Sequence, residues 1–297
     1  MTIPADNAPP HKASKDAGFV QLAAARNAVQ TPASRQKFAD TALKFAAGFW
    51  FLVAVIGQLM FVIYIAAFYG GSAAQGNWAA WNKVLPHGYT PGDTLANAAI
   101  ASHLFLAAII TLGGPLQLIP QIRSYAPTFH RWNGRVYLLT AATACISGLY
   151  MMWFRGGFGD VVQHLGLSLD AILILLCGAM ALRYAIARDI KTHRRWALRL
   201  FMVVSGVWFF RVGLMFWIFV NNGPVGFDPK TFTGPFLNFL AFADYLLPLT
   251  ILEIYLRVRD RAGVPGRLAM SAGLLVLTIA MGVGIFVATM GLWLPRM

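Results

Sequence analysis

The sequence predicts an all-α integral membrane protein built as a bundle of seven transmembrane helices. Apolar residues make up 58% of the chain and charged residues only 12%, whereas soluble domains carry about 25% charge. Apolar runs of roughly 20 residues recur along the chain, and each is long enough to cross about 30 Å of hydrocarbon as a helix. The alternation typical of buried sheets or membrane barrels does not appear.

The seven predicted spans follow one another with mostly short connections. They are Phe45–Phe68, Leu95–Ile119, Val136–Phe154, Val161–Arg183, Trp196–Val220, Phe236–Tyr255 and Leu268–Leu294. In the second span, Pro115 cannot donate a backbone hydrogen bond, so we expect a kink or a loosened turn there. Residues 1–44 are polar and lack a signal-peptide core. We therefore expect a cytoplasmic tail at 1–44 and a membrane domain at 45–297.

The net charge of +13 could suggest a nucleic-acid partner, but its distribution indicates membrane topology instead. If the N-terminus is cytoplasmic, nearly all lysines and arginines fall in cytoplasmic segments. The exceptions are Lys83, Arg155, Lys230 and Arg296 outside, and Arg211 within a span. This asymmetry follows the positive-inside rule. It predicts a multi-pass protein of the bacterial inner membrane with its C-terminus outside, in contact with the lipid bilayer and with no nucleic-acid partner.

Four histidines repeat in two similar pairs. His103 and His164 each lie in one span, and His130 and His193 each begin the span that follows. The second members share their neighbours, as His130-Arg131-Trp132 and His193-Arg194-Arg195-Trp196. In the predicted topology, His130 and His193 meet at the cytoplasmic boundary and His103 and His164 lie in the outer half of the bilayer. The rise of a helix gives the inner pair matching depths and the outer pair different ones.

This arrangement favours a haem protein. Haem iron accepts axial histidines from facing helices of a bundle, and a neutral imidazole avoids burying a charge in the membrane. The anionic propionates could bind Arg131, Arg135 and Arg194 through charge-assisted hydrogen bonds. We therefore predict one or two b-type haems, with the iron held by His130 and His193 and by His103 and His164. Histidine alone could also bind zinc or copper, but we expect no acid or cysteine to complete a closed site at either pair. The alternative is that these histidines are polar anchors at the membrane surface.

Three charged residues fall inside predicted spans. They are Arg211 in span five, Asp170 in span four and Asp244 in span six. Because charges within a membrane are costly and usually pair, we expect Arg211 to form an ion pair with Asp244 or Asp170. A proton path or a contact with a quinone head is the functional alternative.

The stretch from His103 to Arg211 resembles an uncharacterised family of bacterial predicted membrane proteins. The family's marks are a histidine in one span, H-R-x-x-G-R-x-Y opening the next, H-R-x-W-x-x-R, and a late arginine in the following span. In this chain they are His103, His130, Arg131, Gly134, Arg135, Tyr137, His193, Arg194, Trp196, Arg199 and Arg211. His164 lies outside this pattern. The family's activity is unassigned, so the resemblance implies a polytopic membrane protein and no particular reaction.

The layout is also similar to that of the dihaem cytochrome b561 group, in which ligands come from two interleaved helix pairs of a four-helix core. That likeness implies that His103 pairs with His164 and His130 with His193, on spans two to five, and a shared layout alone does not establish function.

These observations lead to two main hypotheses and one further alternative. The first is a b-type haem protein, a possible membrane oxidoreductase, that moves electrons across the membrane or to and from a quinone. The second is a protein without haem, either an accessory subunit of a larger membrane complex or a small-molecule transporter. A membrane enzyme that acts on lipid is the third. The sequence assigns no catalytic residue.

Overall fold

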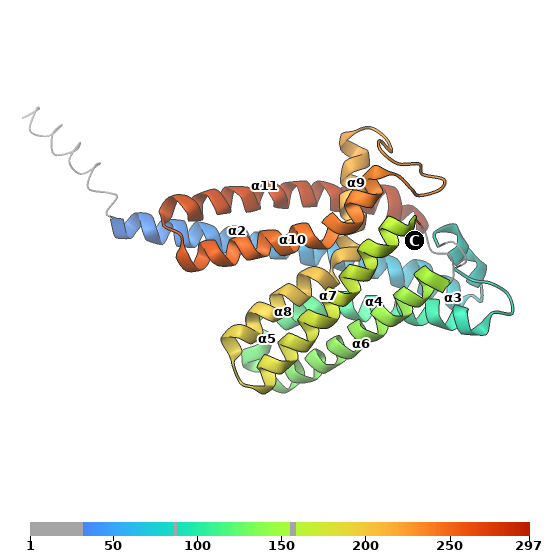
Figure 1. Ribbon diagram of the computed structural model, residues 1–297, viewed down its shortest axis with the longest axis horizontal. Coiled ribbons are helices and arrows are strands. Elements are labelled where there is room, and N and C mark those ends of the chain that lie inside the picture. The colour runs from blue at the N-terminus through green and yellow to red at the C-terminus, as the bar shows by residue number, and fades with distance from the viewer. Residues whose placement is uncertain (1–31, 86–87, 155–158) are drawn as a thin grey trace, which may run out of the picture.

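The computed structural model describes residues 32–85, 88–154 and 159–297, which fold almost entirely as helices (Figure 1). The helices are α2 (Pro32–Tyr64), α3 (Gly71–Ala74), α4 (Thr94–Leu118), α5 (Pro120–Tyr125), α6 (Pro127–Phe154), α7 (Val161–Ile186), α8 (Ile190–Val204), α9 (Gly206–Val220), α10 (Pro235–Arg261) and α11 (Val264–Ala288). Short π and 3-10 turns complete them at Ile65–Gly70, Trp78–Lys83, Thr289–Trp293 and Leu294–Arg296. Residues 1–31 of the predicted tail lie outside the described residues, and α2 already begins at Pro32.

The predicted membrane-spanning architecture is confirmed. Six helices of the described chain are long and apolar enough to cross a membrane, and α8 together with α9 makes a seventh span that is bent by 50°. The break falls at Ser205, between the two helices. Serine and glycine at such a position weaken the helical hydrogen-bond ladder, which is a usual cause of a sharp bend.

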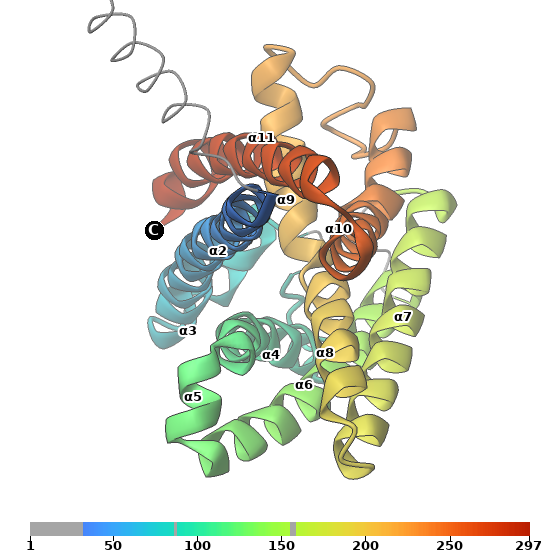
Figure 2. The ribbon, with the colours of Figure 1, turned by 90° about the vertical axis from the view of Figure 1, so that its left-hand side faces the viewer.

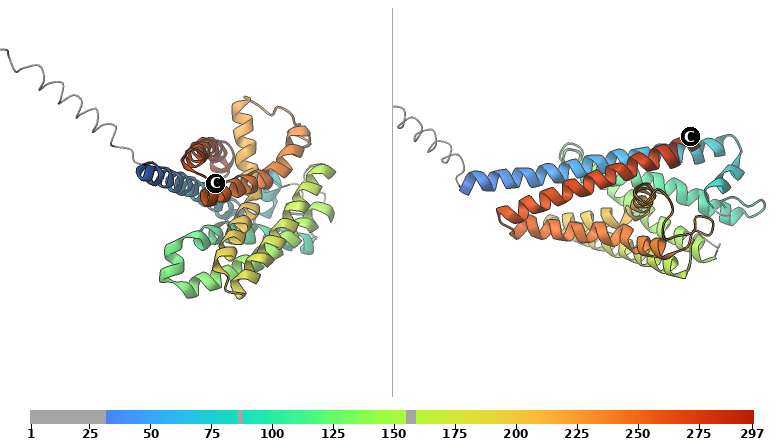
Figure 3. Two further views of the ribbon diagram at one scale, coloured as in Figure 1. Left: turned by 60° about the vertical axis from the view of Figure 1, so that its left-hand side comes forward. Right: turned by 90° about the horizontal axis from the view of Figure 1, so that it is seen from above.

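The helices divide into two groups. α4 packs on α6, α6 on α7, and α7 on α8, so that these four helices form the expected histidine-bearing core. Figure 2 shows them side by side below α2, α10 and α11. The long helices α2 and α11 pack along each other, as Figure 3 shows, and α11 also contacts α9.

The ends of the bundle differ in charge. The starts of α2, α6 and α8 and the connection from α10 to α11 lie at one end, on the left in Figure 1. We call this the basic end, because the arginines that flank these segments gather there. The C-terminus lies away from the basic end.

Aspartates begin three of the spans. The carboxylates of Asp93, Asp160 and Asp189 accept hydrogen bonds from the backbone N–H three residues later, at 3.2, 3.1 and 3.1 Å. Each therefore satisfies one of the donors that the first turn of a helix leaves without an intrahelical partner. The caps fix where α7 and α8 start. As a result His164 and His193 each occupy the fourth position of their helix, as His130 does in α6.

Candidate functional site: two cavities along the histidine-bearing core

A cavity of about 630 Å³ lies at the basic end, between the close of α4 and α7 and the start of α6 and α8. Both His130 and His193 line it, although they are far apart in sequence. Its other walls are mainly apolar and include Leu138, Leu182 and Phe201. We call this space the basic cavity.

The imidazole of His193 is held in one orientation. Its Nδ1 lies 2.9 Å from the carbonyl oxygen of Ala181 on α7. Since a carbonyl oxygen can only accept, Nδ1 donates and the neutral ring keeps its lone pair on Nε2. A hydrogen bond of this kind behind the ring is what fixes most metal-binding histidines.

His130 lines the same cavity, and its hydrogen bonds are less fully satisfied. Its Nδ1 is buried and has no hydrogen-bond partner in the described part of the chain. Its backbone carbonyl accepts a hydrogen bond from Gln117 Nε2 at 3.0 Å, which joins the start of α6 to the end of α4. A buried ring nitrogen without a partner is costly, and a ligand in the cavity would relieve that cost.

Four arginines line the basic cavity, and no acidic residue does among the residues described. They are Arg123, Arg131, Arg135 and Arg194. Burial and, second, the positive charge of Arg194 lower the pKa of the Arg123 guanidinium from its ordinary value. The acids nearby are already engaged, because Asp260 pairs with Arg195 and Glu253 with Arg199. The cavity is therefore strongly electropositive and suited to an anionic or partly anionic ligand.

Arg123 was not among the site residues predicted from the sequence. The sequence places it in a loop between spans, where it counted only towards topology. In the structure Pro120 starts the short helix α5, which carries Arg123 to the mouth of the cavity. A proline just after the end of a long span was the one available signal for this extra helix.

The second predicted pair is not brought to one cavity. His103 Nδ1 lies 3.1 Å from Ser147 Oγ on α6, and the ring packs against Gly148. His164 instead meets the ring of Trp153 edge to face, with centroids 5.3 Å apart. His103 lines a different, more central cavity, whereas His164 lines neither of the two. In the described ranges no three His, Cys, Asp or Glu side chains lie close enough to hold a metal ion.

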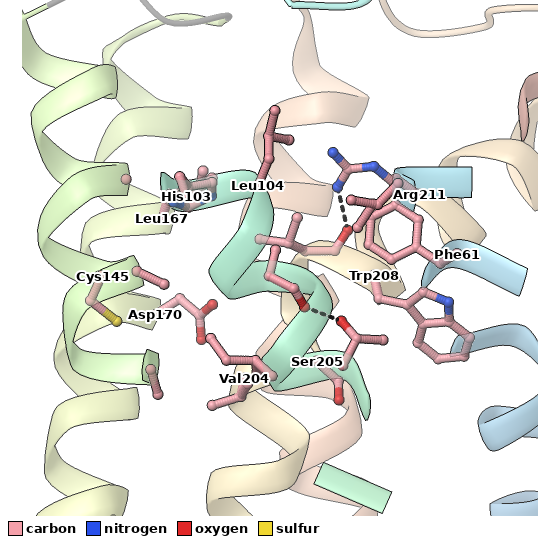
Figure 4. A pocket seen from close by; sticks show the side chains of 18 of the residues that line it. Phe61, His103, Leu104, Cys145, Leu167, Asp170, Val204, Ser205, Trp208 and Arg211 are labelled. Carbon is pink, nitrogen blue, oxygen red and sulfur yellow. Dashed lines mark hydrogen bonds between the residues drawn. The ribbon is translucent and has the colours of Figure 1, made fainter. Parts of the chain in front are cut away.

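The central cavity, of about 400 Å³, is enclosed by α2, α4, α6, α7 and the bent span α8–α9 (Figure 4). Its lining is largely apolar, but polar groups enter it from several helices. They are Gln58, His103, Asp170, Ser205 and Arg211. Figure 4 shows Arg211 on one side of this space and the carboxyl group of Asp170 on the other.

The predicted ion pair of Arg211 is wrong. Its guanidinium donates to the carbonyl oxygen of Val207 at 2.9 Å and lies over the ring of Phe61, 5.0 Å from the centroid. Asp170 Oδ1 and Asp244 Oδ1 are buried with no hydrogen-bond partner among the described residues. The bend at Ser205 explains the difference, because it directs Arg211 on α9 towards the aromatic residues of α2.

Tyr137 and Phe201 line both cavities and form the wall between them. Both side chains are buried. Gly114 of α4 allows this wall to close, because a Cβ atom there would lie 3.1 Å from the Phe201 ring. We expected a kink or a loosened turn at Pro115. In the structure α4 continues as helix through Pro115 to Leu118.

Part of the pattern His-Arg-x-Trp-x-x-Arg, which runs from His193 to Arg199, has a structural role. Arg199 lies over the ring of Trp196, 4.6 Å from its centroid, and binds both carboxylate oxygens of Glu253 at 2.6 and 3.1 Å. This pair joins α8 to α10.

Comparison with known proteins supports the family resemblance carried by these residues. Residues 100–247 match the model of the family described as "Predicted membrane protein (DUF2306)". The matched segment runs from α4 to α10 and includes His103, His130, His193 and Arg211. No curated protein and no solved structure matches the chain, so a likeness to the cytochrome b561 group is not shown. The chain belongs, through its histidine-bearing core, to this family of predicted membrane proteins of unknown function.

Proposed function

We propose that this membrane protein binds one b-type haem in the basic cavity and takes part in electron transfer within the membrane. The observation that carries the proposal is that His130 and His193, from two different helices, line one cavity together with four arginines and no acid. Haem supplies reversible one-electron chemistry when it is bound. The remaining steps concern what the side chains of this chain would do.

The residues present fit the requirements of the group. Two imidazoles are available, one with its Nδ1 held by Ala181 and one with a buried Nδ1 that lacks a partner. The walls between them are apolar, as a porphyrin ring requires. α6 and α8 pack chiefly on α4 and α7, which leaves the space between their first turns open.

In this proposal His193, through Nε2, and His130, through a ring nitrogen, would hold the iron. Arg123, Arg131, Arg135 and Arg194 would bind the propionates. The hydrogen bond to Ala181 keeps the His193 ring from rotating. Apolar side chains such as Leu138 and Phe201 exclude water from the ring faces, which influences the reduction potential.

Tyr137 and Phe201 supply a short contact route from the basic cavity to the central cavity. The proposal therefore has electrons pass between a haem near the basic end and a redox partner that reaches the middle of the bundle. A second haem held by His103 and His164 is left out, because these two histidines do not share a cavity.

We infer the orientation from charge. The basic end would face the cytoplasm of a bacterial inner membrane, with the C-terminus outside, by the positive-inside rule. The proposed haem would then lie near the cytoplasmic surface, and the central cavity nearer the middle of the bilayer.

The visible spectrum of the purified chain tests the proposal. Protein from haem-replete cells should show a Soret band and reducible α and β bands. His130→Ala and His193→Ala should each lose most of this absorbance, whereas His164→Ala, a matched histidine outside the cavity, should keep it. A colourless but well-folded protein would contradict the proposal and favour an accessory subunit or a transporter without haem.

A further inference from the structure

The central cavity is lined by residues with polar atoms that have no hydrogen-bond partner in the described part of the chain. Some of these residues offer donors and others offer acceptors. Arg211 carries only hydrogen-bond donors, of which one is used on Val207. Gln58 donates from Nε2 to Ser205 Oγ at 3.0 Å, but its Oε1 is buried without a partner. Asp170 Oδ1 is buried without a partner as well. Among the described residues, the cavity therefore offers unused donors on one side and unused acceptors on the other.

These groups are fixed by the fold rather than flexible. Gln58 and Asp170 are only 3% and 6% exposed. Asp170 Oδ2 lies against the bend of the fifth span, where a Cβ atom on Gly206 would be 2.9 Å away. Arg211 is held over the Phe61 ring. A buried polar group without a partner costs free energy. Several such groups around one cavity therefore indicate a ligand that forms the missing hydrogen bonds.

The placement of the polar groups limits the ligand. Figure 4 shows Arg211 and the carboxyl group of Asp170 on opposite sides of the cavity. A single ring with an oxygen at each end presents one oxygen to each side. The lining also has hydroxyl groups, from Tyr64, Tyr69, Thr111 and Tyr137. Most of the remaining wall is apolar, with Leu104, Ile110 and Leu149 among its residues, and would accept a hydrocarbon substituent.

We propose that the central cavity binds the head of a lipid-soluble quinone. Arg211 donates to one oxygen of the ring. At the opposite end a quinol hydroxyl donates to Gln58 Oε1, whereas a quinone carbonyl accepts its hydrogen bond from protonated Asp170. Asp170 can donate to a quinone carbonyl when protonated and can accept from a quinol hydroxyl when ionised. His103, which bonds Ser147 through Nδ1, lines the same space and adds a second group able to carry a proton.

An anionic lipid tail such as a fatty acid is the competing occupant, and the observations favour the quinone. A carboxylate only accepts hydrogen bonds, so it would satisfy Arg211 and leave the unused acceptors of Gln58 and Asp170 without donors. The quinone carbonyls also only accept, but the quinol hydroxyls can donate to these acceptors as well as accept from Arg211. Binding at this site does not require haem; only electron exchange with the basic cavity rests on the proposed function.

The test is a titration of the purified full chain in detergent with a short-chain ubiquinone, followed by quenching of tryptophan fluorescence. Trp208 lines the cavity, so quenching should saturate, and Trp208→Phe should remove most of it. Arg211→Leu and Asp170→Leu should each weaken binding about tenfold or more, because each removes every hydrogen-bonding atom of the side chain. His103→Ala should weaken it less, and His164→Ala, a matched histidine outside the cavity, should not change it.

Two further arms keep the result decisive. Sodium laurate should compete poorly with the quinone; tight laurate binding that depends on Arg211 and not on Asp170 would overturn the proposal in favour of a fatty-acid site. His130→Ala protein, which should lack haem, is expected to bind the quinone as well as the wild type does. Loss of binding there would contradict a site in the central cavity.

A photoreactive quinone tests the site if the Arg211 variant does not fold. On the wild type it should label α7 or α9, and labelling only elsewhere would refute the assignment.

Discussion

The carbonyl oxygen of Ala181 on α7 lies 2.9 Å from Nδ1 of His193 on α8, and this contact orients the imidazole towards the basic cavity. The two helices pack closely along their length. The ring orientation therefore depends on the α7–α8 packing and on where α8 begins. The predictions below concern the charges, the cap and the packing that hold this arrangement.

Arg123→Gln should change two properties in opposite directions. The nearby positive charge of Arg194 and burial both disfavour the charged guanidinium and lower its pKa. Removing the charge should raise the thermal midpoint of the haem-free protein, because it relieves like-charge repulsion. The same change should lower haem retention, because a propionate partner is lost. Arg257→Gln, an exposed arginine at the same end outside the cavity, should change neither quantity. A fall in both would contradict the account of the basic cavity.

The start of α8 should loosen in acid. Hydrogen bonds from Thr192 hold the pKa of the Asp189 carboxyl below its ordinary value. A lowered pKa in the folded state means that the cap stabilises the helix above the unfolded value of about 3.9 and is lost as pH falls through the lower folded value. The protection of the Thr192 amide, measured relative to its intrinsic exchange rate at each pH in the haem-free protein, should therefore be present at neutral pH and fall below about pH 4. Asp189→Asn should remove this pH dependence, and an unchanged profile would count against the cap.

Gly284→Ala should destabilise the packing of α11 on α9. A Cβ atom at Gly284 would lie 2.5 Å from the carbonyl oxygen of Val212, a backbone atom that cannot turn aside. We expect a loss of about 1–3 kcal/mol, measured as a lower denaturation midpoint. Gly282→Ala is the matched control, because its nearest neighbour would be 4.0 Å away. Equal effects of both changes would contradict the close approach of the two helices.

The pair of Arg199 and Glu253 should contribute about 1 kcal/mol of coupling, since it is bidentate but partly exposed. A double-mutant cycle with Arg199→Gln and Glu253→Gln measures this coupling directly. Each single change should also loosen the contact between α8 and α10. A coupling energy near zero would show that the Trp196 stacking, and not the ion pair, holds Arg199.

The sequence alone predicted the long membrane-spanning helices, because the length and hydropathy of an apolar run decide whether it can cross a membrane. The meeting of His130 and His193 in one cavity also agrees with the predicted layout, since both begin spans at the same end. His164 differs because a repeat in sequence does not fix rotation about a helix axis, and its ring turns towards Trp153. The bend at Ser205 and the resulting direction of Arg211 depend on packing among α2, α9 and α11, which a single sequence does not show.

The measurement that tests the central claim most directly is low-temperature electron paramagnetic resonance of the oxidised, purified protein. Two imidazoles on one ferric iron should give a low-spin signal in the wild type. His130→Ala and His193→Ala should each convert any haem that remains to a high-spin signal, and added imidazole should restore the low-spin form. The absence of a haem signal from folded protein, or the same low-spin signal in His193→Ala, would contradict haem ligation by this pair.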